Sequence, residues 1–463
     1  MGSGPYGFVG VMARQRGVLF VVCLISLATL WSCRLPRMCV YSQCNHDADS
    51  GSATTASSLS TNIHSGVDLS QPDAPFISWP LARVCKETTW TPGIVFVCDN
   101  NSGGIGNIRN YILTCVRYAI EAGATGLVLP TIRTRSEADL SSLMQSQQGF
   151  DYFFDESHFR KSLQGACPQF TIYSSTDDIP NTMSPFQAEP LTPRTLGVRG
   201  GCDNRELNKH SDRFGLQFRA HVKQHAEEFN LLLPSLKHPR GYRLNWGVQW
   251  DFPVYRDGPE FVATFGGLLR FRADILGLGR KTAAYMREFA AARDQKGGSR
   301  AYAGMHLRTE SDALSNWPRF ENQSRAYLTR ASSMEFQAAY LATGNKTEAE
   351  KLARSASSTY NMGVVTKHEL LKDHPRDLKA LEALTWDQQA LVDFIVLLDC
   401  DYFLGVSPSS FSMNVALKRH LKADGLHTRP WRVGGDGDAW SWLVGSYLRY
   451  WDDWLFMYDS LWP

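Results

Sequence analysis

Charge of one sign and cysteine are both scarce in this chain of 463 residues. Lysine and arginine number 48 against 46 aspartates and glutamates, so the formal net charge is only +2. A chain this close to neutral lacks the basic surface that attracts nucleic acid, and its 43% hydrophobic content excludes an acidic disordered protein. Ten cysteines are too few for a disulfide scaffold of this length. These scarcities favour a large globular enzyme with no nucleic-acid partner.

Long apolar runs are equally scarce, and the conspicuous one lies near the N-terminus. Residues 17–33 carry no charge, and their length is at the lower end of the ~17–25 residues of a membrane-spanning helix. Two arginines precede the run within residues 1–16 and two follow it, so the positive-inside rule does not set its orientation. We predict a cytosolic tail over 1–16 and a signal-anchor transmembrane helix over 17–33. A cleaved signal peptide, which would give a secreted protein, is the alternative.

A polar segment follows the predicted anchor. Residues 45–75 contain no aromatic residue and are dominated by Ser, Thr, Asp and Ala, a composition that cannot bury enough apolar surface to fold. We therefore predict a stalk over 34–84. Three Asn-x-Ser/Thr sequons, at Asn100, Asn322 and Asn345, fit a lumenal location. Tail, anchor, stalk and large domain is the order of a single-pass type II enzyme of the Golgi or endoplasmic reticulum membrane, with its catalytic part in the lumen.

The cysteines after the stalk would face an oxidising compartment. They are Cys85, Cys98, Cys115, Cys167, Cys202 and Cys400. Cys98 lies in a predicted strand and Cys115 on the buried face of a predicted helix, so both fit core positions. Connectivity cannot be read from spacing, and pairing of Cys167 with Cys202 is only a hypothesis. No Cys/His cluster with metal-ligand spacing is recognised, so structural zinc is not expected.

The first chemical motif is a glycine-rich loop between a strand and a helix. The apolar run 93–98 is typical of a strand buried on both faces of a parallel sheet. Helical periodicity then extends over 108–120, and 126–130 forms the next strand of a βαβ unit. The loop GGIGN at 103–107 lets the backbone approach a ligand, and a helix N-terminus favours an anion. Taken alone, a tight turn with no ligand explains it equally well.

A second motif lies where a strand that begins near Ala301 runs into a polar cluster. His306, Arg308, Glu310 and Asp312 would emerge at the carboxyl end of this strand, where open α/β sheets bind ligands. Arg308 could clamp a diphosphate bidentately, with Glu310 or Asp312 orienting it. A surface cluster of salt bridges is the alternative.

The third motif spans a helix, a strand and a serine-rich loop. A capping box at 385–388 precedes an apolar helix in which Asp393 is the only charge over 390–398. A buried carboxylate is costly unless paired, so Asp393 should hold a ligand group or an amide of the core. The strand 402–406 leads to SPSSFS at 407–412. A helix cap needs only one serine, so four serine hydroxyls beside a helix N-terminus suggest a phosphate-binding site.

These motifs together resemble the GDP-fucose protein O-fucosyltransferase family. GGIGN, HLRTESD, VDFIVLLDCDYFLGV and SPSSFS occur in the family's order across about 85–425, and VTKHELL from Val365 resembles a family strand. The resemblance implies an α/β GT-B fold, in which two Rossmann-like domains face a central cleft. It also implies inverting transfer of fucose from GDP-fucose to a hydroxyl of a protein or glycan acceptor, with no metal and no other cofactor.

The resemblance assigns roles by position. The residues placed against the donor are Gly103, Gly104, Gly106, His306, Arg308, Asp393, Ser409, Ser410 and Phe411. The catalytic candidates are Arg308, which would assist the departure of GDP, together with Asn107, Glu310 and Asp312.

Two departures from the family pattern concern the glycine loop. Some relatives have a glutamate there as general base, and others have an arginine, but this chain has Gly104. The base is therefore open among Glu310, Asp312, Asp99 and an acceptor-assisted path. Arg109 could supply the missing positive charge. The alternative function is a non-catalytic lumenal relative that binds a nucleotide sugar, a glycan or a protein partner.

The predicted lumenal part has three segments. They are an N-terminal Rossmann-like domain on the acceptor side (85–255), a C-terminal one on the nucleotide-sugar side (256–430) and an aromatic tail (431–463). The tail carries six of the thirteen tryptophans, and we expect it to pack back on the fold, although a carbohydrate-stacking platform is the alternative. The Asp-x-Asp triplets at 399–401 and 436–438 resemble a metal signature of glycosyltransferases, but a strand start and a glycine turn favour structural roles.

Overall fold

The computed structural model describes residues 67–136, 139–182, 185–196, 213–294, 301–422 and 433–463. Its folded part belongs to one compact unit, 64–463. The predicted cytosolic tail, the anchor over 17–33 and most of the stalk lie outside the described residues, so they stay predictions. Within the described part of the chain, no helix is long and apolar enough to cross a membrane.

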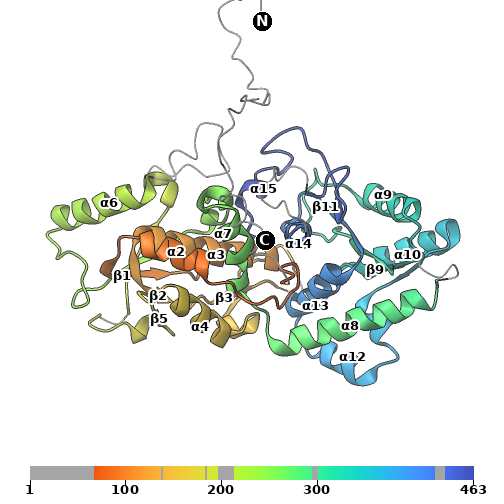
Figure 1. The fold of residues 1–463 in the computed structure, drawn as a ribbon, viewed down its shortest axis with the longest axis horizontal. Coiled ribbons are helices and arrows are strands. Elements are labelled where there is room, and N and C mark those ends of the chain that lie inside the picture. Colours follow the sequence, from red (N-terminus) through yellow and green to blue (C-terminus); the bar gives the residue numbers. More distant parts are fainter. Residues whose placement is uncertain (1–66, 137–138, 183–184, 197–212, 295–300, 423–432) are drawn as a thin grey trace, which may run out of the picture. The chain divides into compact units, whose positions relative to one another are not determined.

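The first half of the fold is built on a five-stranded parallel sheet with the order β5-β2-β1-β7-β6. Strands β1, β2 and β5 are labelled in Figure 1. Its strands are β1 Thr91–Val97, β2 Ala124–Val128, β5 Thr171–Tyr173, β6 Ala188–Leu191 and β7 Arg240–Leu244. Five consecutive residues of β1 are buried, as expected for the central strand of a sheet that is covered on both faces. A short antiparallel pair, β3 Ile132–Thr134 and β4 Ser146–Gln148, lies outside this sheet.

Helices follow these strands as the βαβ pattern predicts. The helices of this half are α2 Trp79–Glu87, α3 Ile105–Ala122, α4 Glu156–Ala166, α6 Phe214–Glu228 and α7 Pro259–Phe265. Short 3-10 turns occur at 150–152, 176–178, 193–196, 246–250, 254–257 and 266–268. Helix α3 ends at Gly123, whose φ of 72° is left-handed and whose N–H bonds to the carbonyls of Ala119 and Ile120. Helix α2 begins inside the segment assigned to the stalk and buries Leu81 and Val84, so the stalk is shorter than predicted.

The second half contains another five-stranded parallel sheet, with the order β10-β9-β8-β11-β12. Its strands are β8 Ala303–His306, β9 Ala338–Ala342, β10 Gly363–Val365, β11 Tyr402–Val406 and β12 Ser441–Val444. Its helices are α8 Ala273–Ala291, α9 Phe320–Ser333, α10 Lys346–Tyr360, α11 Lys367–Leu371, α12 Pro375–Glu382, α13 Trp386–Asp399 and α14 Ser410–His420. The predicted capping box before α13, from Thr385 and Gln388, is present. Two parallel sheets with intervening helices confirm the α/β class.

The C-terminal segment returns to helices of both halves. After α15 Met457–Ser460, Trp462 is completely buried, and its ring packs against Phe252, Phe261 and Phe265. Its indole N–H donates to Thr114 of α3, while its carbonyl accepts a hydrogen bond from Asn414 of α14. The end of the described chain is thus bonded to one helix from each half.

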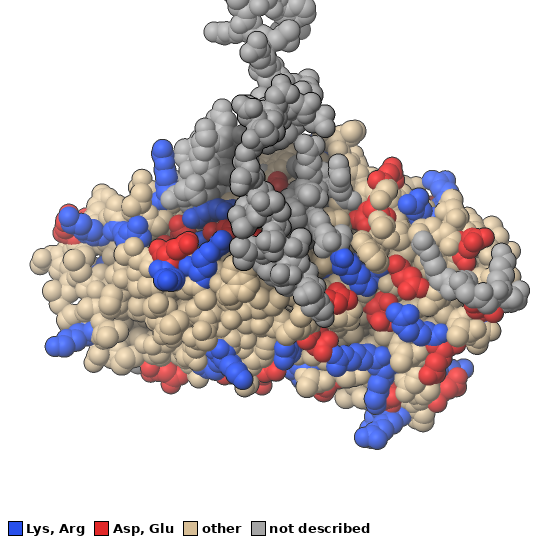
Figure 2. Space-filling model, in the orientation of Figure 1, with Lys and Arg blue, Asp and Glu red and all other residues tan. Residues whose placement is uncertain are grey.

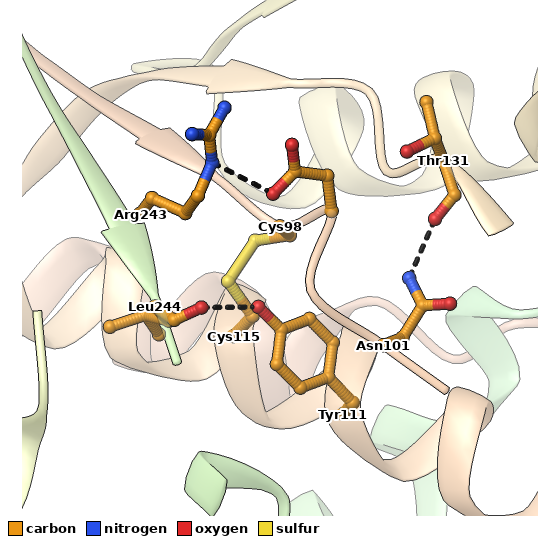
Figure 3. Close-up of a disulfide and its surroundings, with 8 residues drawn as sticks. Cys98, Asn101, Tyr111, Cys115, Thr131, Arg243 and Leu244 are labelled. Atoms are coloured by element: carbon orange, nitrogen blue, oxygen red, sulfur yellow. Dashed lines mark hydrogen bonds and ion pairs between the residues drawn. A yellow bond between two sulfur atoms is a disulfide. The ribbon is translucent and has the colours of Figure 1, made fainter. Parts of the chain in front are cut away.

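Two disulfides replace the predicted cysteine arrangement. A disulfide joins Cys98, which directly follows β1, to Cys115 in the middle of α3 (Figure 3), so these cysteines are not separate core thiols. Cys167 pairs with Cys85, which joins the end of α4 to α2, so the hypothesis of a bond to Cys202 was wrong. Cys202 itself lies outside the described residues.

Surface charge is mixed on the face drawn in Figure 2. Lysine and arginine side chains are interspersed there with aspartate and glutamate side chains. Such interspersion is what a net charge of +2 allows and is unlike a continuous basic groove.

Candidate functional site

The candidate site is a cavity of about 440 Å³ that receives residues from both halves of the fold. From the first half come Gly104 and Ile105, at the start of α3, and Arg135, which follows β3. The second half contributes the segments that follow β8, β9, β10 and β11. A site beyond the carboxyl ends of parallel strands is where α/β folds place their ligands.

Most of the residues predicted to bind the donor meet in this cavity. The predicted residues that line it are Gly104, His306, Arg308, Glu310, Asp393, Ser409 and Phe411. Those that lie outside its lining are Gly103, Gly106, Asn107, Asp312 and Ser410. The three sequence motifs therefore converge in space, although not every residue in them faces the cavity.

The glycine loop brings two helix starts together. A Cβ on Gly106 would lie 2.7 Å from the backbone carbon of Ser410, so only glycine lets α3 approach α14 this closely. Gly103 has a φ of 93°, which favours glycine at the turn. The backbone N–H of Asn107 bonds to the carbonyl of Gly104 at 2.9 Å as the helix begins. The loop glycines thus serve chain geometry, while Gly104 alone among them lines the cavity.

The strand that enters this loop is held by contacts around the Cys98–Cys115 bond (Figure 3). The Tyr111 hydroxyl donates to the carbonyl of Leu244 on β7 at 2.8 Å, and the Asn101 amide donates to the carbonyl of Thr131. The Tyr111 bond joins α3 to β7, and the Asn101 bond joins the loop to the segment before β3.

Arg308 is the centre of an ion-pair cluster at the end of β8. Its guanidinium lies 2.7 Å from Glu310 and 2.8 Å from Asp312, and Asp312 also pairs with Arg135 at 3.0 Å. The side chains of Arg308, Glu310 and Asp312 are only 16%, 8% and 12% exposed. Burial by itself raises the pKa of Glu310, but the attraction of Arg308 and the Gly344 N–H outweigh it and leave the pKa lowered. Glu310 is therefore ionised at neutral pH.

His306 is a neutral group in this cluster. Burial lowers its pKa to about 4, so the imidazole carries no charge at neutral pH. Its Nδ1 lies 2.7 Å from the Ser412 hydroxyl, and its ring lies 4.5 Å from that of Phe411. His306 can therefore offer a ligand a polar contact but not a cation.

Asp393 has the specific partners that its buried position requires. Lys367 donates to one carboxylate oxygen at 2.7 Å, and the Tyr340 hydroxyl donates to the other at 2.6 Å. Both Asp393 and Lys367 line the cavity, and their side chains are 8% and 10% exposed. The partners of Asp393 are therefore a lysine and a tyrosine of the core.

Three basic or aromatic residues of the cavity were not predicted from the sequence, and a fourth basic residue was predicted in the wrong place. Arg135, Lys346 and Trp386 all line it, and the Arg135 guanidinium lies 5.6 Å from the Trp386 ring. Lys346 stands in the first turn of α10 and forms no ion pair among the described residues. Arg109, which was expected to add charge at the loop, instead donates to the carbonyls of Trp462 and Pro463, so that expectation was wrong.

Two further sets of carboxylates are engaged away from the cavity. Asp99, one of the candidates for the base, pairs with Arg243 at 3.0 Å and does not line the cavity. In the first Asp-x-Asp triplet, Asp399 pairs with Arg287 at 2.8 Å and Asp401 accepts a bond from the Ala301 N–H. These partners explain the triplet as part of the fold.

Residues 94–422 match the model of the family described as GDP-fucose protein O-fucosyltransferase. The match extends over more than half of the chain. This chain belongs to that family. The assignment confirms the resemblance that was inferred from the motifs. Membership of the O-fucosyltransferase family also supports classing the chain as a glycosyltransferase. No curated protein matches it in a whole-sequence comparison.

Solved structures that resemble this family member are distant from it in sequence. POFUT1 in complex with GDP-fucose is 14% identical with a TM-score of 0.43, and the match covers 78% of this chain and 100% of that one. The fucosyltransferase NodZ from Bradyrhizobium is 15% identical with a TM-score of 0.35, over 71% and 92%. FUT1 of Arabidopsis thaliana with GDP is 11% identical with a TM-score of 0.33, over 73% and 71%. Because all three scores lie below 0.5, the family assignment depends on the 94–422 match.

Proposed function

We propose that this chain is an inverting glycosyltransferase that moves fucose from GDP-fucose to a hydroxyl of a protein or glycan acceptor. The observation that carries the proposal is the convergence of three motifs of the family, at Gly104, Arg308 and Ser409, on one cavity between two α/β halves. POFUT1 forms complexes with GDP-fucose and with GDP, which agrees with this donor.

The cavity has the charges that a nucleoside diphosphate needs. Its cationic side chains are Arg135, Arg308, Lys346 and Lys367. Arg308 is held in position by its two carboxylates before the donor arrives, so it needs little reorganisation to stabilise the charge that develops on departing GDP. Lys346 has no competing carboxylate among the described residues and can bind a phosphate directly. The α14 N-terminus at Ser409 adds free backbone amides.

We assign the acceptor-facing carboxylate to Glu310. Among the candidate bases, Glu310 lines the cavity, whereas Asp99 and Asp312 do not. Its lowered pKa keeps it ionised at neutral pH, which a proton acceptor requires. The same Arg308 that lowers this pKa also weakens the base, so an acceptor-assisted path remains the competing route. We propose that transfer needs no metal, since the cluster itself supplies the cation.

We further propose that the chain resides in the Golgi or endoplasmic reticulum membrane with its catalytic part in the lumen. The predicted anchor over 17–33 supports this location, with secretion after signal cleavage as the alternative. The Cys85–Cys167 and Cys98–Cys115 bonds also support an oxidising compartment.

Calorimetry with GDP and GDP-fucose, followed by a transfer assay that detects released GDP and product mass, tests the proposal. We expect the parent to bind both nucleotides with micromolar affinity. We expect Arg308→Lys to lose turnover, because an ammonium lacks the planar, five-donor geometry with which a guanidinium can contact two carboxylates and a diphosphate at once. Arg354→Lys, a change at an exposed arginine on α10, is the matched control and should turn over normally. Absence of GDP binding at millimolar concentration would overturn the proposal. Binding without turnover on any acceptor would support the non-catalytic alternative.

A further inference from the structure

Three potential metal ligands meet on the first half of the fold, away from the cavity. His221 and His225 lie four residues apart on α6, and Glu189 extends from the edge strand β6. The Nε2 atom of His221 is 2.8 Å from a carboxylate oxygen of Glu189. One ligand atom from each of the three residues lies within 4.8 Å of the others. None of these side chains lines the nucleotide cavity.

We propose that Glu189, His221 and His225 bind one zinc ion or a similar late first-row divalent metal. Two imidazoles and one carboxylate are a donor set that zinc accepts with a fourth position left to water. Calcium and magnesium prefer oxygen ligands throughout, so this set disfavours them. In a tetrahedral site with metal–ligand distances of about 2.0–2.2 Å the ligand atoms are roughly 3.4 Å apart. The three side chains are only half-buried, so small rotamer changes can close the remaining difference of up to ~1.4 Å.

The scaffold under these ligands is well packed. On α6, Phe218 packs against Phe96 and Tyr242, which lie on β1 and β7, at ring distances of 5.9 and 4.9 Å. On the sheet, Glu189 stands opposite Tyr242 in the register of β6 and β7. The helix and the strand that carry the ligands are therefore fixed to the same core, as a preorganised site requires.

The i, i+4 spacing gives both histidines the same side of α6. Residues four apart on a helix are surface neighbours, and two such histidines can chelate one ion. The His225 ring also lies 4.6 Å from the ring of Phe229, one turn further along α6. The sequence alone did not indicate zinc, because His-x-x-x-His at 221–225 supplies only two ligands. The third, Glu189, is 32 residues from His221 and joins them only when β6 and α6 lie side by side.

A bound metal would tie α6 to the edge of the first sheet. Because it would bind the folded chain and not the unfolded one, it would stabilise the fold in proportion to the logarithm of its concentration. The site is independent of the proposed transferase reaction, and we expect turnover to be the same with and without zinc at room temperature.

Isothermal titration of the full-length chain with zinc chloride tests the site, using protein that carries no histidine tag and has been stripped of metal with a chelating resin. We expect a zinc-binding event of micromolar affinity or tighter that His221→Ala and His225→Ala each weaken at least ~10-fold. His238→Ala, at an exposed histidine of the same half, is the matched control and should bind as the parent does. Magnesium chloride should give no matching heat.

Thermal unfolding supplies a second measurement. Zinc should raise the melting temperature of the parent and of His238→Ala but not that of His225→Ala. Alanine favours helix more than histidine does, so these variants should keep α6 folded, and circular dichroism checks this. Absence of zinc binding at ~100 µM, or zinc binding that neither histidine variant weakens, would overturn the proposal.

Discussion

Removing the charge of Arg308 should lower stability as well as activity, and the size of the loss can be worked out from its contacts. In Arg308→Met, Glu310 and Asp312 lose a guanidinium that lies 2.7 and 2.8 Å away. Removing one partner of a buried ion pair typically lowers the free energy of unfolding by about 3–5 kcal/mol. Here Asp312 keeps Arg135, and Glu310 keeps the Gly344 N–H at 2.8 Å. We therefore expect a loss at the lower end of that range, about 3 kcal/mol, at neutral pH.

The penalty should depend on pH in a defined direction. The folded-state pKa of Glu310 is lowered, so its pairing contributes stability above the ordinary glutamate pKa of about 4.3 and loses it as pH falls through the folded-state value. In Arg308→Met the lowering cation is gone and burial remains, so Glu310 takes up a proton at a higher pH than in the parent. Protonation removes the cost of a buried unpaired charge. The difference in unfolding free energy between parent and variant should therefore shrink from pH 7.5 to pH 4.5.

Urea denaturation monitored by tryptophan fluorescence measures this difference at both pH values. Arg354→Met is the control, because Arg354 is 69% exposed and its partner Glu350 is 3.6 Å away, a kind of pair worth about 0–1 kcal/mol. A penalty for Arg308→Met no larger than that of the control would refute the reasoning. A penalty that grows on acidification would refute the pKa argument.

Two further predictions concern the core. Lys367→Met should cost about 3–5 kcal/mol because Asp393 is left buried without its cation, and adding Asp393→Asn should recover part of the loss in urea denaturation. A double variant no more stable than Lys367→Met would contradict this. Removing the Cys85–Cys167 disulfide, which closes a loop of 82 residues, should lower the free energy of unfolding by about 4.5 kcal/mol. Removing the Cys98–Cys115 disulfide, which closes a loop of 17 residues, should lower it by about 3 kcal/mol. Equal losses in thermal unfolding of Cys85→Ser and Cys98→Ser would rule out loop closure as the main cause.

The sequence predicted those features whose causes are local. The apolar runs of β1 and β11 and the Thr385 capping box depend on neighbouring residues, and all are present. The cluster at the end of β8 was predictable for the same reason, because Arg308 and its carboxylates lie within five positions of one another.

Features that depend on distant contacts were missed or misplaced. Arg135 meets Asp312 across 177 positions, and no local pattern announces that pair. Arg109 is the fifth residue of α3, and the rotation of the helix directs its side chain to the C-terminal carbonyls and not to the cavity. Cysteine pairing likewise depends on where α2 and α4 pack, which spacing does not encode.

Arg135 links the two halves of the fold beside the cavity through ion pairs and a cation–π contact. Arg135 belongs to the first half of the fold, whereas its partners Asp312, Asp387 and Trp386 all belong to the second. Any motion that parted the halves around a nucleotide would break an ion pair and a cation–π contact together. Dissolved salt screens ion pairs, so higher ionic strength would weaken these contacts of Arg135 and make separation of the two halves easier. Substrate exchange would then respond to salt, while bond breaking inside the closed cavity would not.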